Sequence, residues 1–312
     1  MALARRAASS TLKVAVPAST SNVGTGFDAL GIALDHRLTA TWSPAEKTSV
    51  DREGPLSESL LSVGRDPVLR GMRRAAILAG KDLPSGHLLV RTDFPPARGL
   101  GASGAGLVAG LLLGTKLVGG RLSKEVLLEE AIKLEGHPEN ATASLLGGAT
   151  WSGADGKGGW VRIPVALHKD LRFLLIVPPY PLATKRAREV LPSSVAFARA
   201  TAQASRVPLL LEGLRTLDPV LLRVGVLDEL HVAPRLKLLT GAESMLQFAD
   251  QAGALATTLS GAGSALLVLT RVGDSKALET RLRARVRRLW GESGDVLRAA
   301  PVKRGAEFVK GS

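Results

Sequence analysis

Apolar and polar positions alternate at several places along the chain, and this pattern predicts β-strands. Leu12, Val14 and Val16 lie two residues apart, so one face of the first such segment would be buried. We expect this strand to end at Pro17 and a polar loop to follow it over residues 18–28. Comparable apolar runs predict further strands over residues 37–42, 87–92, 148–152, 160–165, 172–177, 255–259 and 265–270.

Helical spacing of apolar residues predicts helices over residues 67–79 and 123–134, with a strongly apolar helix between them. In that helix Gly106, Gly110 and Gly114 recur at every fourth position. A glycine inside a helix costs about 0.5–1 kcal/mol relative to alanine. The three glycines therefore indicate one smooth helical face that presses against a neighbouring sheet or helix.

The length of the chain suggests two lobes. With 312 residues it exceeds the usual size of a single hydrophobic core, so we expect one two-lobed domain or two domains that share a cleft. The predicted strands of the first half close near residue 165, and helical patterns then run to about residue 253. We therefore place the lobes at residues 1–165 and 166–312.

The apolar helix is preceded by a glycine-rich loop over residues 95–106. Closely spaced glycines let backbone N–H groups approach a ligand, and a helix N-terminus adds unpaired donors and a positive dipole end, so the loop suits a phosphate. Gly99, Gly101 and Gly104 match the dinucleotide fingerprint G-x-G-x-x-G. A helical pattern follows where that fold requires a second strand and an acidic residue, and the Walker pattern is absent.

A second polar cluster, residues 135–140, lies between apolar segments. His137 is the only histidine there, which is weak evidence for zinc, whereas Glu135 and Glu139 offer oxygen ligands that suit Mg²⁺. The alternative is a helix C-terminus closed by Gly136 and Pro138. The polar loop after the first strand, and the turn over residues 260–264, are each explained by turn chemistry or by a ligand clamp.

Charge is the unusual feature of the composition. The chain has 41 Lys and Arg against 28 Asp and Glu, a net charge of +13. Its densest basic segment is helical and has few aromatic residues that could stack on bases, so we expect an exposed helix face and no nucleic-acid site. The residues concerned are Arg281, Arg283, Arg285, Arg287 and Arg288.

Cysteine is absent, which excludes disulfides, thiolate metal sites and a thiol nucleophile. Residues 1–10 lack the apolar stretch of a secretory signal. The longest apolar run ends at Lys116, well short of the roughly 20 residues that a membrane-spanning helix needs. We expect a cytoplasmic protein that does not bind membranes.

The motifs, taken together and in order, resemble the GHMP superfamily of small-molecule kinases, and within it the homoserine kinases. Residues 17–31 are similar to that family's first motif, and residues 95–105 to its phosphate loop, typically P-x-x-R-G-L-G-S-S-A-A. Residues 135–140, with Gly147 and Gly148 after them, resemble its E-G-H-P-D-N segment. Residues 260–263 resemble its third, glycine-rich motif, so the likeness spans nearly the whole chain.

The sequence departs from the family pattern at several positions. Ala102 stands in place of the first of two serines, and Gly104, Glu139 and Ser264 replace alanine, aspartate and proline. The second serine is retained as Ser103. Another departure concerns the nucleotide base: Asp66 occupies the position of an asparagine near the family's adenine pocket.

The resemblance implies an α+β fold of two lobes with the active site in the cleft between them. It implies ATP-dependent phosphorylation of the hydroxyl of L-homoserine, a step of threonine biosynthesis, with ATP and Mg²⁺ as cofactors. Ser103 and Glu135 would hold the metal ion. The residues that would bind the phosphates are Pro95, Pro96, Ala97, Arg98, Gly99, Leu100, Gly101, Ala102, Ser103, Gly104 and Ala105.

The substrate implied by the resemblance is a zwitterion, so its site needs a carboxylate for the ammonium and arginines for the carboxylate. Asp28 or Glu139 would take the first role, and Arg188 and Arg235 the second, because planar guanidinium groups bind carboxylates bidentately. The further substrate-binding residues are Asn22, His137, Asn140 and Gly263. The residues placed nearest the chemistry are Asn140, Thr184 and Arg188.

Asn140 bears on the mechanism. Mevalonate and galactose kinases of the superfamily have an aspartate at this position, and an amide cannot accept a proton as a base. We therefore expect transfer to proceed without a carboxylate base at position 140.

Other readings remain open at this point. A kinase of the same superfamily that acts on threonine or mevalonate is the first alternative, and the arginine pair and Asn140 argue against mevalonate. A nicotinamide-dependent oxidoreductase lacks its second strand and acid, and a non-enzymatic basic binding module leaves the cleft motifs unexplained. A small molecule is the expected partner, and the sequence leaves open whether the protein forms a homodimer.

Overall fold

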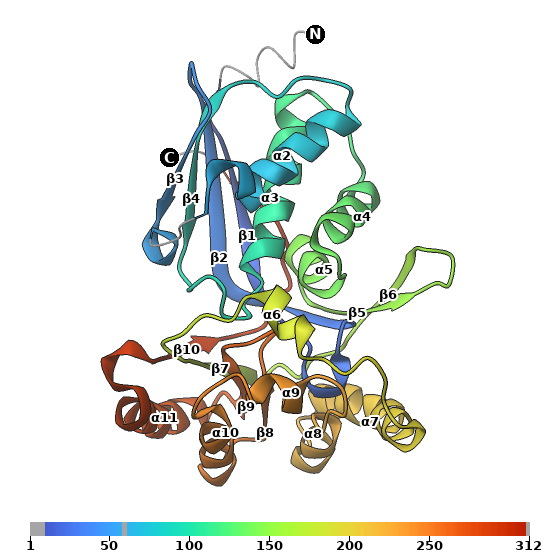
Figure 1. The fold of residues 1–312 in the computed structure, drawn as a ribbon, viewed down its shortest axis with the longest axis vertical. Coiled ribbons are helices and arrows are strands. Elements are labelled where there is room, and N and C mark those ends of the chain that lie inside the picture. Colours follow the sequence, from blue (N-terminus) through green and yellow to red (C-terminus); the bar gives the residue numbers. More distant parts are fainter. Residues whose placement is uncertain (1–9, 58–60, 310–312) are drawn as a thin grey trace.

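The computed structural model describes residues 10–57 and 61–309, and the segment before residue 10, assessed above for a secretory signal, lies outside them. A seven-stranded sheet dominates the upper part of the molecule in Figure 1, in the order β11-β1-β2-β4-β3, with β5 on β2 and β6 on β5. Only the β3–β4 pair is parallel in this described sheet. Its strands are β1 (Leu12–Ser21), β2 (Leu30–Pro44), β3 (Ser49–Glu53), β4 (Gly86–Thr92), β5 (Ala149–Ala154), β6 (Trp160–Pro164) and β11 (Glu307–Val309).

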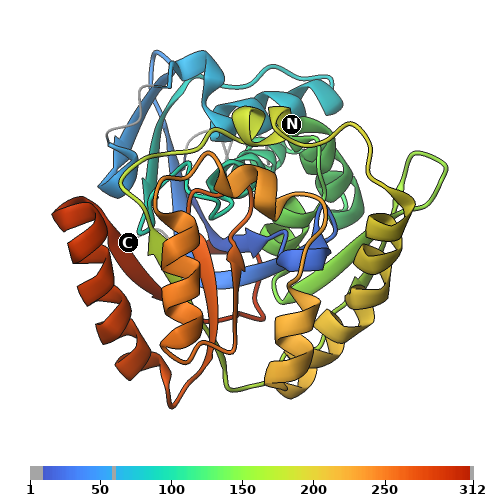
Figure 2. The ribbon, with the colours of Figure 1, turned by 60° about the horizontal axis from the view of Figure 1, so that its bottom comes forward.

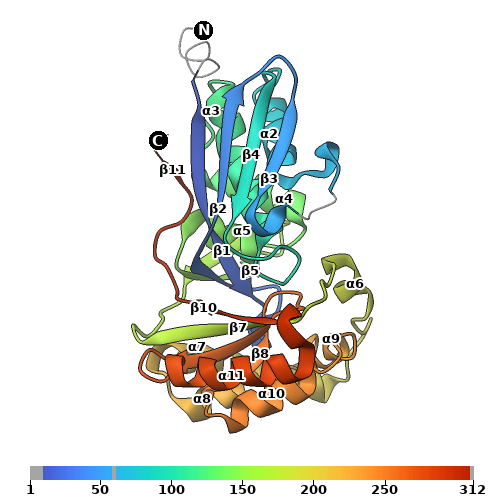
Figure 3. The same ribbon diagram turned by 90° about the vertical axis from the view of Figure 1, so that its left-hand side faces the viewer.

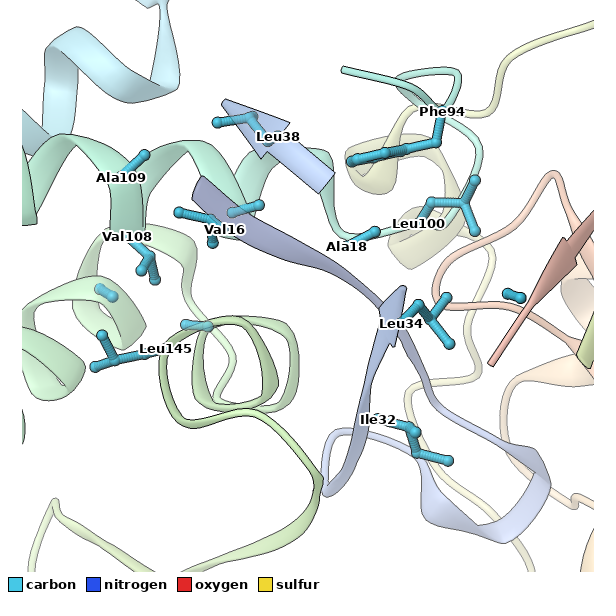
Figure 4. Close-up of a cluster of buried hydrophobic side chains, with 14 of the residues drawn as sticks. Val16, Ala18, Ile32, Leu34, Leu38, Phe94, Leu100, Val108, Ala109 and Leu145 are labelled. Carbon is cyan, nitrogen blue, oxygen red and sulfur yellow. The ribbon is translucent and has the colours of Figure 1, made fainter. Parts of the chain in front are cut away.

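Four helices cover one face of this sheet (Figure 3). The core lies between the two layers. Figure 4 shows Val16 and Leu38 of the strands near Val108 and Ala109 of α3 and Leu145 of α5, all of them buried. The helices are α2 (Pro67–Leu78), α3 (Ala102–Leu117), α4 (Lys124–Glu135) and α5 (Glu139–Leu146).

A second, antiparallel sheet runs across the lower part in the order β10-β7-β9-β8. Helices α7, α8, α10 and α11 lie below this sheet in Figure 1 and are turned toward the viewer in Figure 2. Helices α6 and α9 lie near the level at which the two halves meet (Figures 1 and 3). The strands are β7 (Leu171–Val177), β8 (Ala256–Leu259), β9 (Leu266–Arg271) and β10 (Asp295–Ala299). The helices are α6 (Thr184–Glu189), α7 (Phe197–Thr216), α8 (Pro219–Gly225), α9 (Val232–Leu236), α10 (Ala242–Gln251) and α11 (Ser275–Trp290).

The first strand is longer than the sequence suggested. The prediction that it ends at Pro17 was wrong: β1 continues to Ser21, with an irregularity in its register against β2 between Pro17 and Ser19. A proline is tolerated within a strand at such a bulge, where the ladder is interrupted. The predicted loop over residues 18–28 is therefore strand as far as Ser21, followed by a turn of 3-10 helix, Gly24–Gly26.

The glycine face of α3 packs on α2, as predicted. A Cβ atom added at Gly110 would lie 1.9 Å from the carbonyl oxygen of Val68, and one at Gly114 would lie 2.6 Å from that of Met72. Backbone-to-backbone contact of this kind leaves no space for a side chain. The two helices therefore cross closely because these positions carry glycine.

The α+β class predicted above is confirmed, while the division into residues 1–165 and 166–312 stays a prediction. The last described strand, β11, returns to the first sheet and pairs with β1, so the chain crosses between the halves more than once. The five arginines of the basic segment over residues 281–288 lie on α11, where all but Arg285 are exposed. Within the two described ranges, no helix combines the length and the apolar composition needed to cross a membrane.

Candidate active site

A cavity of about 1020 Å³ is lined by residues of both halves of the chain. It extends from the start of α2 past the glycine-rich loop to the connection between α4 and α5, and on to α6, Arg235 and the β8–β9 turn. Most residues that the sequence placed in the site line this cavity. These are Asn22, the loop residues 95–103, Glu135, His137, Glu139, Asn140, Thr184, Arg188, Arg235 and Gly263. Asp28 contacts the site through Arg188, and Gly104 and Ala105 lie in the first turn of α3.

The glycine-rich loop ends at the N-terminus of α3, a helix of 16 residues. Gly101 precedes it in a left-handed conformation, φ 68°, and no side chain of the described residues caps the helix. The loop is fixed from the other half: Ser260 donates from Oγ to the Gly99 carbonyl at 2.7 Å, and a Cβ at Gly99 would lie 1.9 Å from the Ser260 carbonyl oxygen. The N–H groups of a helix N-terminus and the positive end of its dipole suit an anion.

The α4–α5 connection carries three titratable side chains into the cavity. Gly136 ends α4 at φ 89°, as the helix-terminus alternative predicted, and the turn after it presents Glu135, His137 and Glu139. His137 Nδ1 lies 3.0 Å from Glu139 Oε1, although the ring is not aligned for a hydrogen bond. The predicted helix end is therefore confirmed, and the same turn places polar side chains on the cavity, while the metal site stays a prediction.

The ionisation of this cluster reflects its burial. Burial raises the pKa of Glu135 to about 7, with the Glu139 charge acting in the same direction and the His137 charge opposing it. Burial lowers the pKa of His137, but the Glu139 and Glu135 carboxylates outweigh this effect, so its pKa lies above the usual 6.5. The two carboxylates are thus held close together at an electrostatic cost.

The donor atoms here fit a divalent cation. The Oε2 atoms of Glu135 and Glu139 are buried and have no hydrogen-bond partner among the described residues. A Cβ at Gly104 would lie 2.6 Å from Glu135 Oε2, so this glycine leaves room for the carboxylate beside the helix turn that carries the exposed Ser103. No group of three or more His, Cys, Asp or Glu side chains within the described ranges forms a metal cage. Mg²⁺ commonly binds one or two carboxylates together with substrate phosphates, so few protein ligands are needed.

Asn140 lies beside Gly101 of the glycine-rich loop, and both the oxygen and the nitrogen of its amide form hydrogen bonds. Ser19 donates to Oδ1 at 2.9 Å, and Nδ2 donates to Glu139 Oε1 at 3.2 Å. Ser21 also donates to that carboxylate oxygen, at 3.4 Å. Both serines lie in the motif over residues 17–31, but the sequence analysis named neither of them as a site residue.

Asp28 and Arg188 form a bidentate ion pair. Nη1 of Arg188 donates to Oδ2 at 3.0 Å and Nη2 donates to Oδ1 at 2.7 Å, and this contact raises the pKa of Arg188. Asn22 accepts a hydrogen bond from the Asp28 N–H at 2.8 Å. Asn22 and Asp28 both have positive φ angles, 57° and 50°, which are uncommon outside glycine and concentrate at functional sites.

Arg235 is buried to 1 % exposure, and its burial, with the charge of Arg188, lowers its pKa to about 10. The ring of Phe27 lies near both arginines, 5.8 Å from Cζ of Arg188 and 5.2 Å from Cζ of Arg235. His231 stacks on Phe27 and contacts Arg235 at 3.0 Å. The sequence analysis named neither Phe27 nor His231; the signals available were Phe27 beside Asp28 and His231 one helical turn before Arg235.

Asp66, which departs from the family's asparagine, has a structural role at the other end of the cavity. Its Oδ1 accepts from the N–H groups of Val68 and Leu69 and caps α2, and its Oδ2 pairs with Arg52 at 2.9 Å. Asp66 and Arg52 both line the cavity. The aspartate charge is therefore neutralised by a neighbour on β3.

Comparison with known proteins places the chain in a family. Residues 68–148 match the GHMP kinases N terminal domain. The homoserine kinase of Thermosynechococcus vestitus is 35% identical over 270 residues, which cover 86% of this chain and 90% of that protein. The homoserine kinase of Synechococcus sp. (strain WH7803) is 37% identical over 83% of this chain and 84% of its own length.

A solved structure agrees in fold. The crystal structure of homoserine kinase from Cytophaga hutchinsonii superimposes with a TM-score of 0.81 at 24% identity, over 96% of this chain and 97% of that one. The likeness of fold therefore extends over nearly the whole chain. The chain belongs to the homoserine kinase family of the GHMP kinases.

Proposed function

We propose that this protein transfers the γ-phosphoryl group of ATP to the hydroxyl of L-homoserine, giving O-phospho-L-homoserine and ADP. The observation that carries the proposal is that one cavity joins the uncapped N-terminus of α3 to the Asp28–Arg188 pair and Arg235. The helix end suits phosphates and the charged groups suit an amino acid. Membership of the homoserine kinase family supports the same assignment.

Phosphoryl transfer asks the protein mainly for positioning and charge stabilisation. The loop N–H groups of residues 99–104 would bind the ATP phosphates. Ser103 and Glu135 would hold Mg²⁺, which neutralises charge on the phosphates when bound. Arg188 and Arg235 would bind the substrate carboxylate, and Asp28 or Glu139 the ammonium. Asn22, His137, Thr184 and Gly263 would complete the pocket.

In the reaction the homoserine oxygen bonds to the γ-phosphorus, the bond from that phosphorus to the bridging oxygen breaks, and ADP leaves. Asn140 would orient the hydroxyl but cannot take its proton. In a loose transition state the attacking oxygen has formed little of its bond to phosphorus, so the hydroxyl needs no base at that stage. Its proton would leave late, to the phosphoryl oxygens or to water. Ser19 and Glu139 keep the amide of Asn140 oriented for this role.

A coupled assay for ADP release tests the proposal. Purified protein is given Mg-ATP with L-homoserine, L-threonine, L-serine or mevalonate as the acceptor. We expect turnover with homoserine to exceed turnover with each of the other three by orders of magnitude. Equal or greater turnover with one of them would assign the protein to that substrate instead.

A further inference from the structure

Arg235 is held in place by a histidine that itself does not line the cavity. His231 is fully buried at the N-terminus of α9, one turn before Arg235. Its Nδ1 lies 3.0 Å from Arg235 Nη1, and its Nε2 lies 3.0 Å from the carbonyl oxygen of Gly24. The imidazole of His231 thus connects Arg235 to the turn after β1.

The two contacts determine the tautomer of His231. A carbonyl oxygen can only accept, so Nε2 carries the hydrogen that is donated to Gly24. A guanidinium can only donate, so Nδ1 must offer its lone pair to Arg235. Burial lowers the pKa of His231 well below 6.5; Asp228, whose Oδ1 lies 3.7 Å from Nε2, opposes this, while the charge of Arg235 adds to it. The ring is therefore neutral at physiological pH.

Other contacts complete a rigid setting for the guanidinium. Arg235 Nε donates to the Ala187 carbonyl at 3.1 Å, on the same helix as Arg188. Phe27 stacks on His231 with ring centroids 4.8 Å apart and lies against the guanidinium group. Asp228 accepts hydrogen bonds from the backbone N–H groups of residues 230–232 and fixes the start of α9. Neither His231 nor Arg235 can move without losing a buried polar contact.

We propose that His231 is a positioning residue for substrate recognition: its neutral imidazole, tied to the Gly24 carbonyl, accepts one guanidinium N–H of Arg235 and orients the group for a substrate carboxylate. This rests on the proposed function, in which the substrate is an amino acid. His231 acts through Arg235 and does not touch the reacting atoms. Its loss should therefore affect recognition of the carboxylate more than the chemistry.

Two substitutions separate the nitrogens of the ring. In His231→Asn the amide oxygen can replace Nδ1 as the acceptor for Arg235, whereas in His231→Gln the amide nitrogen can replace Nε2 as the donor to Gly24. We expect His231→Gln to raise the KM for homoserine about tenfold or more, and His231→Asn to rescue most of this, because a buried guanidinium donor loses its partner only in the first. The KM for ATP should stay unchanged in both, as it should in the control His87→Gln.

A second acceptor makes the test specific to the carboxylate. 3-Aminopropan-1-ol is homoserine without its carboxylate, and wild type should use it far less efficiently. We expect His231→Gln to lower kcat/KM for homoserine but to leave the low value for 3-aminopropan-1-ol unchanged, so that the ratio between the two falls about tenfold. Equal losses with both acceptors, or equal KM values in the Asn and Gln variants, would overturn the inference.

The same measurements distinguish a folding defect, and a wrong proposed function, from a wrong role for His231. If His231→Gln does not fold, His231→Asn alone decides: it must keep the wild-type ratio of homoserine to 3-aminopropan-1-ol, and a lower ratio contradicts the role of Nδ1. Wild type that phosphorylates neither acceptor would overturn the proposed function. Wild type that prefers homoserine, with variants that keep this preference, would overturn only the role of His231.

Discussion

Arg188 and Asp28 pair bidentately although 160 positions separate them in the sequence, with N–O distances of 3.0 and 2.7 Å. Both side chains are about one third exposed, 36% and 34%, so the pair is not part of the core, and Arg188 lines the cavity. Exposed pairs of this kind add little to stability. A cation beside an anion instead complements a zwitterionic amino acid.

We predict that Arg188→Leu weakens the binding of homoserine and leaves the binding of ATP unchanged. Loss of one charge-assisted contact costs about 1.5–3 kcal/mol, which is roughly a 10- to 150-fold fall in kcat/KM for homoserine. The thermal midpoint should change little. Arg186→Leu, on the same helix and 65% exposed, is the matched control and should behave as wild type. An unchanged KM for homoserine in Arg188→Leu would refute the role of this arginine.

The second prediction concerns the metal ion. Ser103→Ala and Glu135→Gln should each raise the Mg²⁺ concentration required for half-maximal rate by about 10-fold or more, because each removes an oxygen ligand from a small set. Removal of Mg²⁺ with a chelator should abolish turnover in wild type. Because Ser103 is exposed and does not cap α3, its substitution should leave the melting temperature unchanged. Titration of Mg²⁺ at saturating ATP and homoserine measures this, and a wild-type requirement in both variants would place the metal elsewhere.

A third prediction tests the contact between α2 and α3. Gly110→Ala should destabilise the protein by roughly 1–3 kcal/mol or more through overpacking, although alanine is the better helix former by about 1 kcal/mol. The new Cβ would lie 1.9 Å from the Val68 carbonyl oxygen, and backbone cannot give way cheaply. At Gly64 nothing lies within 4 Å of an added Cβ, so Gly64→Ala serves as the control. Equal denaturation midpoints for the two variants would show that the helices are not in close contact.

The fourth prediction concerns pH. His36 Nδ1 lies 3.3 Å from Asp93 Oδ1, and Nε2 lies 2.8 Å from the Arg298 carbonyl oxygen, so both nitrogens face acceptors and the charged imidazolium is favoured. The hydrogen bond to Asp93 raises the pKa of His36 above 6.5. Burial raises the pKa of Asp93, but the contact with His36 and the hydrogen bond from the Arg37 N–H together outweigh this and hold it below 3.8.

The pKa shifts of His36 and Asp93 determine how the free energy of unfolding changes with pH. The contribution of His36 is fully present below pH 6.5 and is lost as the pH rises through the folded-state pKa. The contribution of Asp93 is present above pH 3.8 and is lost as the pH falls through its folded-state value. The free energy of unfolding should therefore differ most between wild type and His36→Gln near pH 5–6, and the difference should shrink toward pH 8. A constant difference across urea titrations from pH 5 to 8 would contradict the charged pairing.

Local patterns predicted most of the elements, because amphipathic spacing reflects burial directly. The helix over residues 67–79 and the smooth glycine face of α3 are examples. The pattern failed at Pro17, where a bulge lets β1 continue and brings Ser19 to Asn140 and Ser21 to Glu139. A bulge depends on the partner strand, so it cannot be predicted from the sequence of one strand alone.

The candidate site was predicted in part, and the missing part has a common cause. Motif residues such as Glu135 and Asn140 were identified from the resemblance to the family. The pairing of Arg188 with Asp28, the contact of His231 with Gly24 and the contact of Arg235 with Phe27 join segments about 160 to 210 positions apart. Such contacts arise from the packing of the two halves and carry no local periodicity.

The acceptor specificity of the purified protein decides whether homoserine is its substrate. With saturating Mg-ATP, kcat/KM is measured for L-homoserine, L-threonine, L-serine and mevalonate by ADP release, and the phosphorylated product is identified by mass spectrometry. We predict O-phospho-L-homoserine, with homoserine preferred over every other acceptor by at least about 100-fold. Mevalonate has no ammonium group to bind the site's carboxylate, and the hydroxyl of serine or threonine is one carbon nearer the charged groups, so it would not reach the position of the homoserine hydroxyl. A preference for mevalonate or threonine, or ADP release that does not depend on homoserine, would contradict it.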